Sequence, residues 1–174
     1  MSRGHNSPRS AFTLLEVLVV ILILLILAAL VVPNYGYFIA KAEETVCISR
    51  MRNLQTALRS YLDDHQAIWP QGPQPEASGW TEFWLTTLEP YGVAPKGWEC
   101  PTIKKMLRGA EEPAFTLHYV PTTFDTTPNI AYRWATQPWL IEAANAHGKG
   151  PLIAFPDGSV TPFFRVLAEQ GVSP

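Results

Sequence analysis

The segment from Phe12 to Val32 constrains the fold of this chain most, because its 21 residues carry a single charged side chain, that of Glu16. A helix rises about 1.5 Å per residue, so a helix of this length spans the roughly 30 Å hydrocarbon core of a bilayer. The segment therefore predicts a membrane-spanning helix. A carboxylate well inside such a helix costs about 2.5 to 3.5 kcal/mol on insertion scales, so the presence of Glu16 needs an explanation.

A cleaved secretory signal is the alternative interpretation of this segment. Arg3 and Arg9 precede the apolar run, and small residues occur near its end in "ILAAL". However, the run is longer than the apolar region of about 7 to 15 residues in a usual signal peptide. Pro33 and three aromatic residues follow it closely and make a poor cleavage site. We therefore expect the helix to be a retained anchor.

The charges that flank the span predict its orientation. Arg3 and Arg9 precede it, whereas Lys41 on the other side is followed at once by Glu43 and Glu44. The positive-inside rule then leaves the N-terminus in the cytoplasm and the rest of the chain in the periplasm or its equivalent. We therefore expect a single-pass membrane protein.

The exported part of the chain has no basic character. After the span there are 11 Lys and Arg residues against 14 Asp and Glu residues. A nucleic-acid-binding domain would need a basic patch or stripe to neutralise phosphates. We therefore expect no nucleic-acid partner.

The helix is expected to continue beyond the membrane as an amphipathic helix. Apolar positions recur there at steps of three and four, which is the spacing of a helical stripe. They are Cys47, Met51, Leu54, Leu58, Tyr61 or Leu62, and His65. Pro33 removes one backbone hydrogen bond and Gly36 is a weak helix former, so a kink or a melted turn is expected between them. We assign residues 12–36 to the membrane helix and 37–68 to the amphipathic helix.

Residues 69–174 are expected to form a small head, which makes the whole chain an α+β protein with an antiparallel sheet. "TEFWLTTLEPYG" predicts a short helix, and "AFTLHYV" and "NIAYRWAT" predict strands because they are rich in aromatic and β-branched residues. "PLIAFPDGSVTPFF" predicts a hairpin, with Asp157 and Gly158 as a two-residue type I′ turn. Pro156 and Pro162 cannot donate to the ladder and should lie at an edge or at a non-bonded position.

Cys47 and Cys100 are the only cysteines, and both lie on the side predicted to be exported. Two cysteines in an oxidising compartment commonly pair, so a disulfide is the preferred interpretation, with two buried free thiols as the alternative. A metal site at these residues is not expected, because neither cysteine has a second ligand at Cys-x-x-Cys or Cys-x-x-His spacing.

No enzyme signature is visible in the sequence. His5, His65, His118 and His147 are dispersed, with no Ser, Cys or acidic partner at a recognisable spacing. Asp125 and Asp157 are weak calcium candidates, but Ca²⁺ takes six to eight oxygens and both residues read equally well as turn residues. We expect a protein with neither catalytic residues nor a cofactor.

The stretch "AFTLLEV", Ala11 to Val17, resembles the class III signal of type IV pilins and of the pseudopilins of type II secretion. The resemblance is specific over about residues 8 to 36. It implies that prepilin peptidase removes residues 1–11 as a leader by cutting between Ala11 and Phe12, and methylates the new N-terminus. It also places Pro33 where these proteins carry a helix-distorting proline. The family usually has Gly immediately before the cut, where this chain has Ala11.

The resemblance gives Glu16 a partner. Cleavage creates an amine at Phe12, one helical turn away, and in a bundle of parallel helices the amine of a neighbouring subunit can also reach this carboxylate. Phe12 and Glu16 are therefore expected to form the assembly contact. A glutamate that merely snorkels to the cytoplasmic interface of a plain anchor is the alternative.

The function that the resemblance implies is structural. The favoured role is a subunit of a type II secretion pseudopilus, and a major or minor type IV pilus subunit is the alternative. The implied partners are prepilin peptidase, other pilin-like subunits and the assembly platform of the inner membrane. A signal-anchored periplasmic enzyme or binding module is the alternative from a different class.

Overall fold

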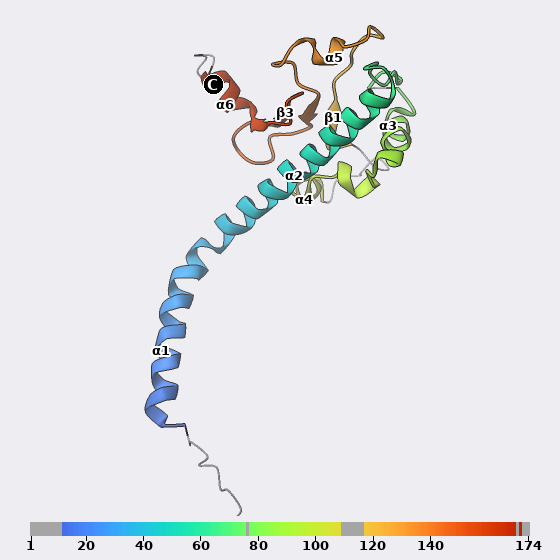
Figure 1. The fold of residues 1–174 in the computed structure, drawn as a ribbon. Coiled ribbons are helices and arrows are strands. Elements are labelled where there is room, and N and C mark those ends of the chain that lie inside the picture. Colours follow the sequence, from blue (N-terminus) through green and yellow to red (C-terminus); the bar gives the residue numbers. More distant parts are fainter. Residues whose placement is uncertain (1–11, 76, 109–116, 170, 172–174) are drawn as a thin grey trace, which may run out of the picture. The chain divides into compact units, whose positions relative to one another are not determined.

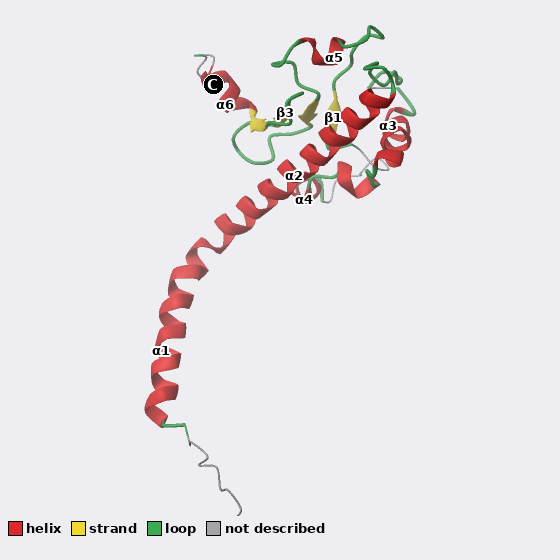
Figure 2. Ribbon diagram, viewed as in Figure 1, coloured by secondary structure: helices red, strands yellow, loops and turns green. Residues whose placement is uncertain are grey.

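The computed structural model describes residues 12–75, 77–108, 117–169 and 171. The chain divides into two compact units, residues 1–39 and residues 40–174. We call the second unit the head and describe each unit by itself. The long N-terminal helix and the small antiparallel sheet of the head (Figures 1 and 2) confirm the predicted α+β class.

The first unit is helical throughout its length after Thr13. Helix α1 runs from Leu14 to Val31, and a 3₁₀ turn, η1, covers Val32–Asn34. Pro33 lies in this turn, where its missing N–H and fixed φ are tolerated. The side-chain amide of Asn34 donates to the carbonyl of Leu30 at 3.1 Å. The α-helical pattern is therefore interrupted at the proline, whereas Gly36 lies within the next helix; a bend at these residues stays a prediction.

Helix α2, Tyr35–Asp64, forms the spine of the head with its later turns. Its buried apolar face is made of Cys47, Met51, Leu54, Ala57, Leu58 and Leu62. This face agrees with the stripe read from the sequence except at its end. His65 is exposed and stacks on Tyr61 with ring centroids 3.9 Å apart. The helix ends because Gln66 and Ala67 adopt left-handed backbone conformations, with φ of 55° and 61°.

Two short helices and two 3₁₀ turns follow α2 along the chain. Helix α3 spans Trp80–Leu88, and helix α4 spans Pro101–Met106. The 3₁₀ turns η2, Glu89–Tyr91, and η3, Pro95–Trp98, lie between them. Four fully buried tryptophans fill the core of the head: Trp69, Trp84, Trp98 and Trp139. The predicted helix in "TEFWLTTLEPYG" is thus present, and its aromatic residues belong to the core.

The sheet has four strands of three residues each in the order β1-β2-β3-β4, all antiparallel. Their bounds are β1 Tyr119–Pro121, β2 Leu140–Glu142, β3 Leu152–Ala154 and β4 Val160–Pro162. Pro162 lies in the edge strand β4, as its missing N–H predicts. Helix α6, Phe163–Glu169, follows the sheet. Residues 114–116 of the strand predicted in "AFTLHYV" lie outside the described residues.

The prediction of a strand in "NIAYRWAT" is wrong. Ile130–Arg133 forms the single-turn helix α5, and the strand of this region is β2, further along the chain. Asn129 starts the turn with a φ of 65°, a left-handed conformation that Asn tolerates. The indole of Trp139 donates to the carbonyl of Ala131 at 2.8 Å, so core packing fixes the turn. Strand propensity is weak against such tertiary contacts.

The predicted hairpin is present, but its turn differs from the prediction. Gly158 has a φ of 86°, whereas Asp157 is not among the residues with positive φ that a type I′ turn would require. The N–H of Gly158 donates to the carbonyl of Phe155 at 3.1 Å, and that of Phe155 donates to Ser159 at 3.0 Å. This is a three-residue loop closed by a left-handed glycine. Pro156 favours it because its φ suits the first corner of an ordinary turn.

Ion pairs link α2 to its surroundings at the base of the head. The carboxylate of Glu43 in α2 accepts from Lys105 of α4 and from the hydroxyl of Thr102 at 3.1 Å. The hydrogen bond from Lys105 is the largest cause of a lowered pKa at Glu43. Next to it, Glu44 pairs with Lys41 at 2.6 Å. The contacts of Glu43 hold α4 against α2, whereas the Lys41–Glu44 pair lies within α2.

We expect the free energy of unfolding of the Glu43→Gln variant at neutral pH to be lower than that of the wild type by less than about 1 kcal/mol. The loss is small because surface ion pairs contribute little to stability. The lowered pKa means that this stabilisation is present above the ordinary value of 4.5 and is lost as the pH falls through the folded-state pKa. The difference from the wild type should therefore vanish in acid. Urea unfolding of the two full-length proteins in detergent, followed by near-ultraviolet circular dichroism between neutral and acid pH, measures this difference. A difference that persists unchanged in acid would contradict the assignment.

Candidate functional sites

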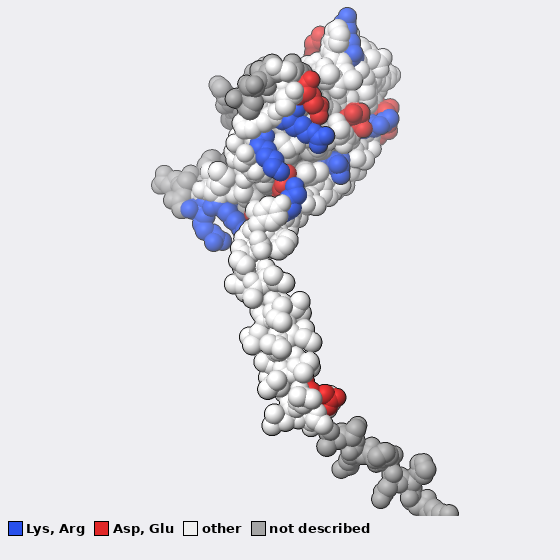
Figure 3. Space-filling model, turned by 90° about the vertical axis from the view of Figure 1, so that its left-hand side faces the viewer, with Lys and Arg blue, Asp and Glu red and all other residues white. Residues whose placement is uncertain are grey.

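The N-terminal candidate site is an apolar helix with one carboxylate near its start. Every described residue of α1 is exposed, and no residue of that helix is buried within the chain. Figure 3 shows this unit as uncharged surface apart from one acidic patch, and Glu16 is its only acidic or basic residue among those described. Phe12 is 79% exposed. Ala11 lies outside the described residues, so the cleavage site itself is not placed.

Glu16 takes part in a capping box at the start of α1. The hydroxyl of Thr13 accepts from the N–H of Glu16 at 3.2 Å, and the carboxylate of Glu16 accepts from the N–H of Thr13 at 3.2 Å. These two bonds satisfy donors that every helix start leaves without a partner. Sequence reasoning missed this local role, although Thr13 followed three residues later by Glu16 is the usual signature. Glu16 therefore has a capping role in addition to any role in assembly.

The helix is suited to a membrane by length and composition. The helical stretch from Leu14 to Asp64 is the one in the described part of the chain that is long and apolar enough to cross a bilayer, and its most apolar part is not buried inside the chain. Transfer of each Val, Leu or Ile side chain out of water contributes about 1.5 to 3 kcal/mol. A surface made of such side chains needs lipid or another protein to cover it. The helix fits a single-pass anchor in the inner membrane.

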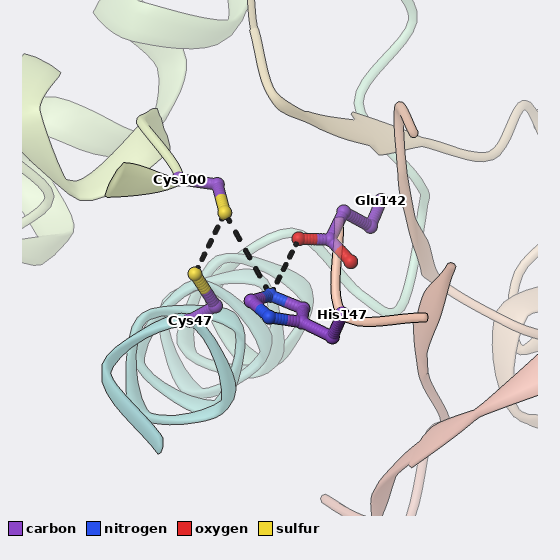
Figure 4. Close-up of side chains that lie close together, drawn as sticks. All are labelled: Cys47, Cys100, Glu142 and His147. Atoms are coloured by element: carbon purple, nitrogen blue, oxygen red, sulfur yellow. Dashed lines mark hydrogen bonds and ion pairs between the residues drawn. The ribbon is translucent and has the colours of Figure 1, made fainter. Parts of the chain in front are cut away.

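The second candidate site lies inside the head, where four side chains from four segments point toward one another (Figure 4). Cys47 comes from α2, Cys100 precedes α4, Glu142 ends β2, and His147 lies in the loop between β2 and β3. Their ligand atoms all lie within 4.8 Å of one another. The two sulfur atoms are 2.7 Å apart, and both cysteines are buried.

His147 lies at the centre of this group. Its Nε2 atom is 3.8 Å from the sulfur of Cys100 and 3.3 Å from Oε1 of Glu142. The side chain of His147 is 4% exposed, and that of Glu142 is fully buried. Oε1 of Glu142 has a contact of ion-pair length but no partner with hydrogen-bond geometry, whereas Oε2 accepts from the N–H of Leu152 at 3.1 Å. One carboxylate oxygen is thus fixed, and the other is left facing the cluster.

The cluster has unusual electrostatics because its groups share a buried space. Burial raises the pKa of Glu142 to about 7. The hydrogen bond with Cys100 lowers the pKa of Cys47, and the same contact, together with burial, raises the pKa of Cys100. A hydrogen bond from the thiol of Cys100 therefore stabilises the thiolate of Cys47, and Cys100 in turn loses its own proton less readily. Burial also raises the pKa of Tyr119 beside them.

The histidines of the head have different surroundings. Nδ1 of His118 accepts from the N–H of Cys100 at 2.7 Å, which makes it a hydrogen-bonded core residue. His65 is exposed and its Nδ1 lies 2.8 Å from the carbonyl of Tyr61. His147 alone of these three joins the cluster, and sequence reasoning had set it aside with the others. The only signal available was its place in "NAHGKG", ahead of the hairpin.

The remaining candidates from the sequence do not assemble into a site. Asp125 accepts from the N–H of Thr127 at 2.8 Å, and Asp157 accepts from that of Ser159 at 2.8 Å, so both carboxylates stabilise turns. Neither belongs to the cluster, which is the one group of three or more potential metal ligands found among the described residues. The Cys47–Cys100 disulfide stays a prediction. No metal site was expected because neither cysteine has a second ligand nearby in the sequence. That criterion does not detect ligands that come from distant segments of the chain.

Comparison with known proteins identifies the N-terminal segment. The family model described as the prokaryotic N-terminal methylation motif matches residues 6–32. No curated protein and no solved structure matches the chain. The matched residues include Phe12, Glu16 and the whole of α1. The chain therefore carries, at residues 6–32, the prepilin signature of type IV pilin-like proteins.

Proposed function

We propose that this chain is a structural subunit of a pseudopilus that serves type II protein secretion. Prepilin peptidase would cut between Ala11 and Phe12 and methylate Phe12, and the processed subunit would then polymerise. The observation that carries the proposal is the methylation motif at residues 6–32, which coincides with a helix whose apolar surface is exposed all round. In a soluble domain this apolar surface would be exposed to water, which is unfavourable.

The exposed surface of α1 explains why assembly is favourable. Before assembly, lipid covers the helix, and Arg3 and Arg9 keep its N-terminus in the cytoplasm. In a filament, the same surface packs against the helices of neighbouring subunits. The head stays outside the membrane in both states, because its surface carries mixed charges (Figure 3). The partners are prepilin peptidase, other pilin-like subunits and an inner-membrane assembly platform.

Glu16 would supply the specific contact in this packing. In the unprocessed chain its carboxylate caps the helix through the N–H of Thr13. Cleavage would add a charged amine at Phe12, one turn away. In a low-dielectric helix bundle an unpaired charge is costly, so pairing between the amine of one subunit and Glu16 of the next favours assembly and sets the axial stagger.

A type IV pilus subunit is the alternative within the same class of protein. The short head and the "VVPN" sequence directly after the span favour the pseudopilus. Either machine would use the same processing and the same Glu16 contact. The identity of the co-assembled subunits, obtained by crosslinking in the native organism, separates the two.

Processing is the direct test of the proposal. We expect the intact mass of the chain extracted from membranes that contain prepilin peptidase to equal that of residues 12–174 plus one methyl group. Without the peptidase, the full-length mass should remain. A Phe12→Ala variant serves as a control for the position of the cut. A chain that keeps residues 1–11 in the presence of active peptidase would contradict the proposal and favour a plain anchor.

A further inference from the structure

We propose that Cys47, Cys100, Glu142 and His147 form a structural zinc site inside the head. The ligand atoms are the two thiolate sulfurs, Nε2 of His147 and Oε1 of Glu142. All four lie within 4.8 Å of one another in a buried space (Figure 4). This inference stands apart from the proposed assembly function, since none of the four residues lies in the methylation motif.

The spacing of the ligand atoms fits a tetrahedral ion at two of the edges measured. With zinc bonds of about 2.0 to 2.3 Å, the edges of the tetrahedron are about 3.4 Å between nitrogen and oxygen and about 3.6 Å between nitrogen and sulfur. The observed distances are 3.3 Å between His147 and Glu142, and 3.8 Å between His147 and Cys100. The sulfurs lie 2.7 Å apart and would separate by about 1 Å to reach their edge.

The combination of sulfur, nitrogen and oxygen donors indicates which class of metal ion the site would bind. Thiolate and imidazole ligands favour zinc over calcium and magnesium, which take oxygen ligands. Four protein ligands complete the tetrahedron, so no position is left open for water or substrate. A closed site of this kind is structural and contributes to folding.

A disulfide would account for the two sulfurs but would not explain why Glu142 and His147 are buried beside them. Oε1 of Glu142 is fully buried and has no hydrogen-bond partner, which is costly for a carboxylate. A single Nε2–H of His147 cannot point at Cys100 and at Glu142 at once. An ion at the centre contacts all four atoms, and its double positive charge offsets two of the three negative charges of the thiolates and the carboxylate.

The surrounding contacts hold the ligands as they do in known metal sites. Leu152 of β3 donates to the second oxygen of Glu142, which leaves Oε1 free to bind. His118 accepts from the backbone N–H of Cys100 and fixes the start of α4. Such outer contacts orient the ligands and commonly change metal affinity about 10- to 100-fold.

The site would link four separate segments of the head. Cys47 lies on α2, Cys100 at α4, Glu142 in the sheet and His147 in a loop. Each strand of the sheet has only three residues. A metal ion held by all four would add its binding free energy to the stability of the folded head.

The test uses the full-length protein, extracted in detergent without reductant or chelator and then denatured in the presence of an alkylating reagent. We expect about one zinc ion per chain by elemental analysis, and a denatured mass that shows two alkylated cysteines. After removal of the zinc, Co²⁺ added alone should produce the absorption of a tetrahedral cobalt thiolate. The variants Glu142→Gln and His147→Gln keep both cysteines, so they separate a metal site from a disulfide.

Zinc content should fall to near zero in the His147→Gln variant and at least tenfold in Glu142→Gln at limiting zinc, and it should stay unchanged in the control His65→Gln. The control changes an exposed histidine that directly follows α2, outside the cluster. Circular dichroism of each variant checks that the head is folded. A metal-free wild type with a Cys47–Cys100 disulfide would overturn the proposal. So would a zinc content equal in all three variants, or a metal-free wild type with two alkylated cysteines.

Discussion

The Glu16→Gln variant is expected to insert into the membrane and be processed as the wild type is, while its amount in sheared filaments falls at least tenfold. Glutamine keeps the size of the side chain and can still accept from the N–H of Thr13, so the capping box is retained. Only the negative charge is lost. The amine of Phe12 is then left without a partner in an apolar bundle, and breaking a buried pair in this way costs about 3 to 5 kcal/mol.

The Thr13→Ala variant is the matched control, because it removes the cap and keeps the charge. Loss of a helix cap costs about 1 kcal/mol, so assembly should remain near the wild-type level. Immunoblots of the membrane fraction and of the sheared filament fraction measure both variants. If Glu16→Gln assembles normally while Thr13→Ala does not, Glu16 acts as a helix cap and the assembly contact is refuted.

Replacing Trp69 by alanine is expected to destabilise the head by about 3 to 5 kcal/mol, the usual cost of removing a large buried aromatic side chain. Trp69 is 1% exposed and its ring centroid lies 4.7 Å from that of Phe124 and 5.5 Å from that of Trp139. Its truncation therefore opens a cavity among the aromatic residues. The midpoint of urea unfolding, followed by near-ultraviolet circular dichroism of the full-length protein, reports the loss.

Two further variants separate cavity formation from other effects. Trp69→Phe removes the indole nitrogen, which has no hydrogen-bond partner, so it should cost clearly less than alanine. Trp134 is 53% exposed, with the guanidinium of Arg133 5.2 Å from its ring, and its replacement by alanine should cost less than about 1 kcal/mol. Equal losses for Trp69→Ala and Trp134→Ala would contradict the core described above.

The sequence was most informative where the signal was local and periodic. The apolar run of α1 and the stripe from Cys47 to Leu62 are repeated over many residues, so composition and spacing suffice to predict them. The hairpin at Gly158 was also predictable, although the single-residue detail of its turn was not. The strand predicted at residues 129–136 failed because the Trp139 indole and the left-handed Asn129 decide that segment.

The buried cluster shows why part of a site escapes such reasoning. Cys47 and Cys100 are 53 positions apart, and Cys100 and His147 are 47 positions apart. Local ligand spacings find sites built on one turn or hairpin. They do not find a site whose ligands meet only when α2, α4 and the sheet pack together. Glu142 carried no signal at all, because β2 itself was not predicted.

The most direct test of the central claim is the mass of this chain in a purified filament. Cells that produce the protein with prepilin peptidase and a pilus-type assembly system are sheared, and the released filaments are purified and analysed by intact-mass spectrometry. The account predicts a chain of residues 12–174 with one added methyl group in the filament fraction. A processed chain found only in the membrane, with filaments that lack it, would contradict a role as a filament subunit.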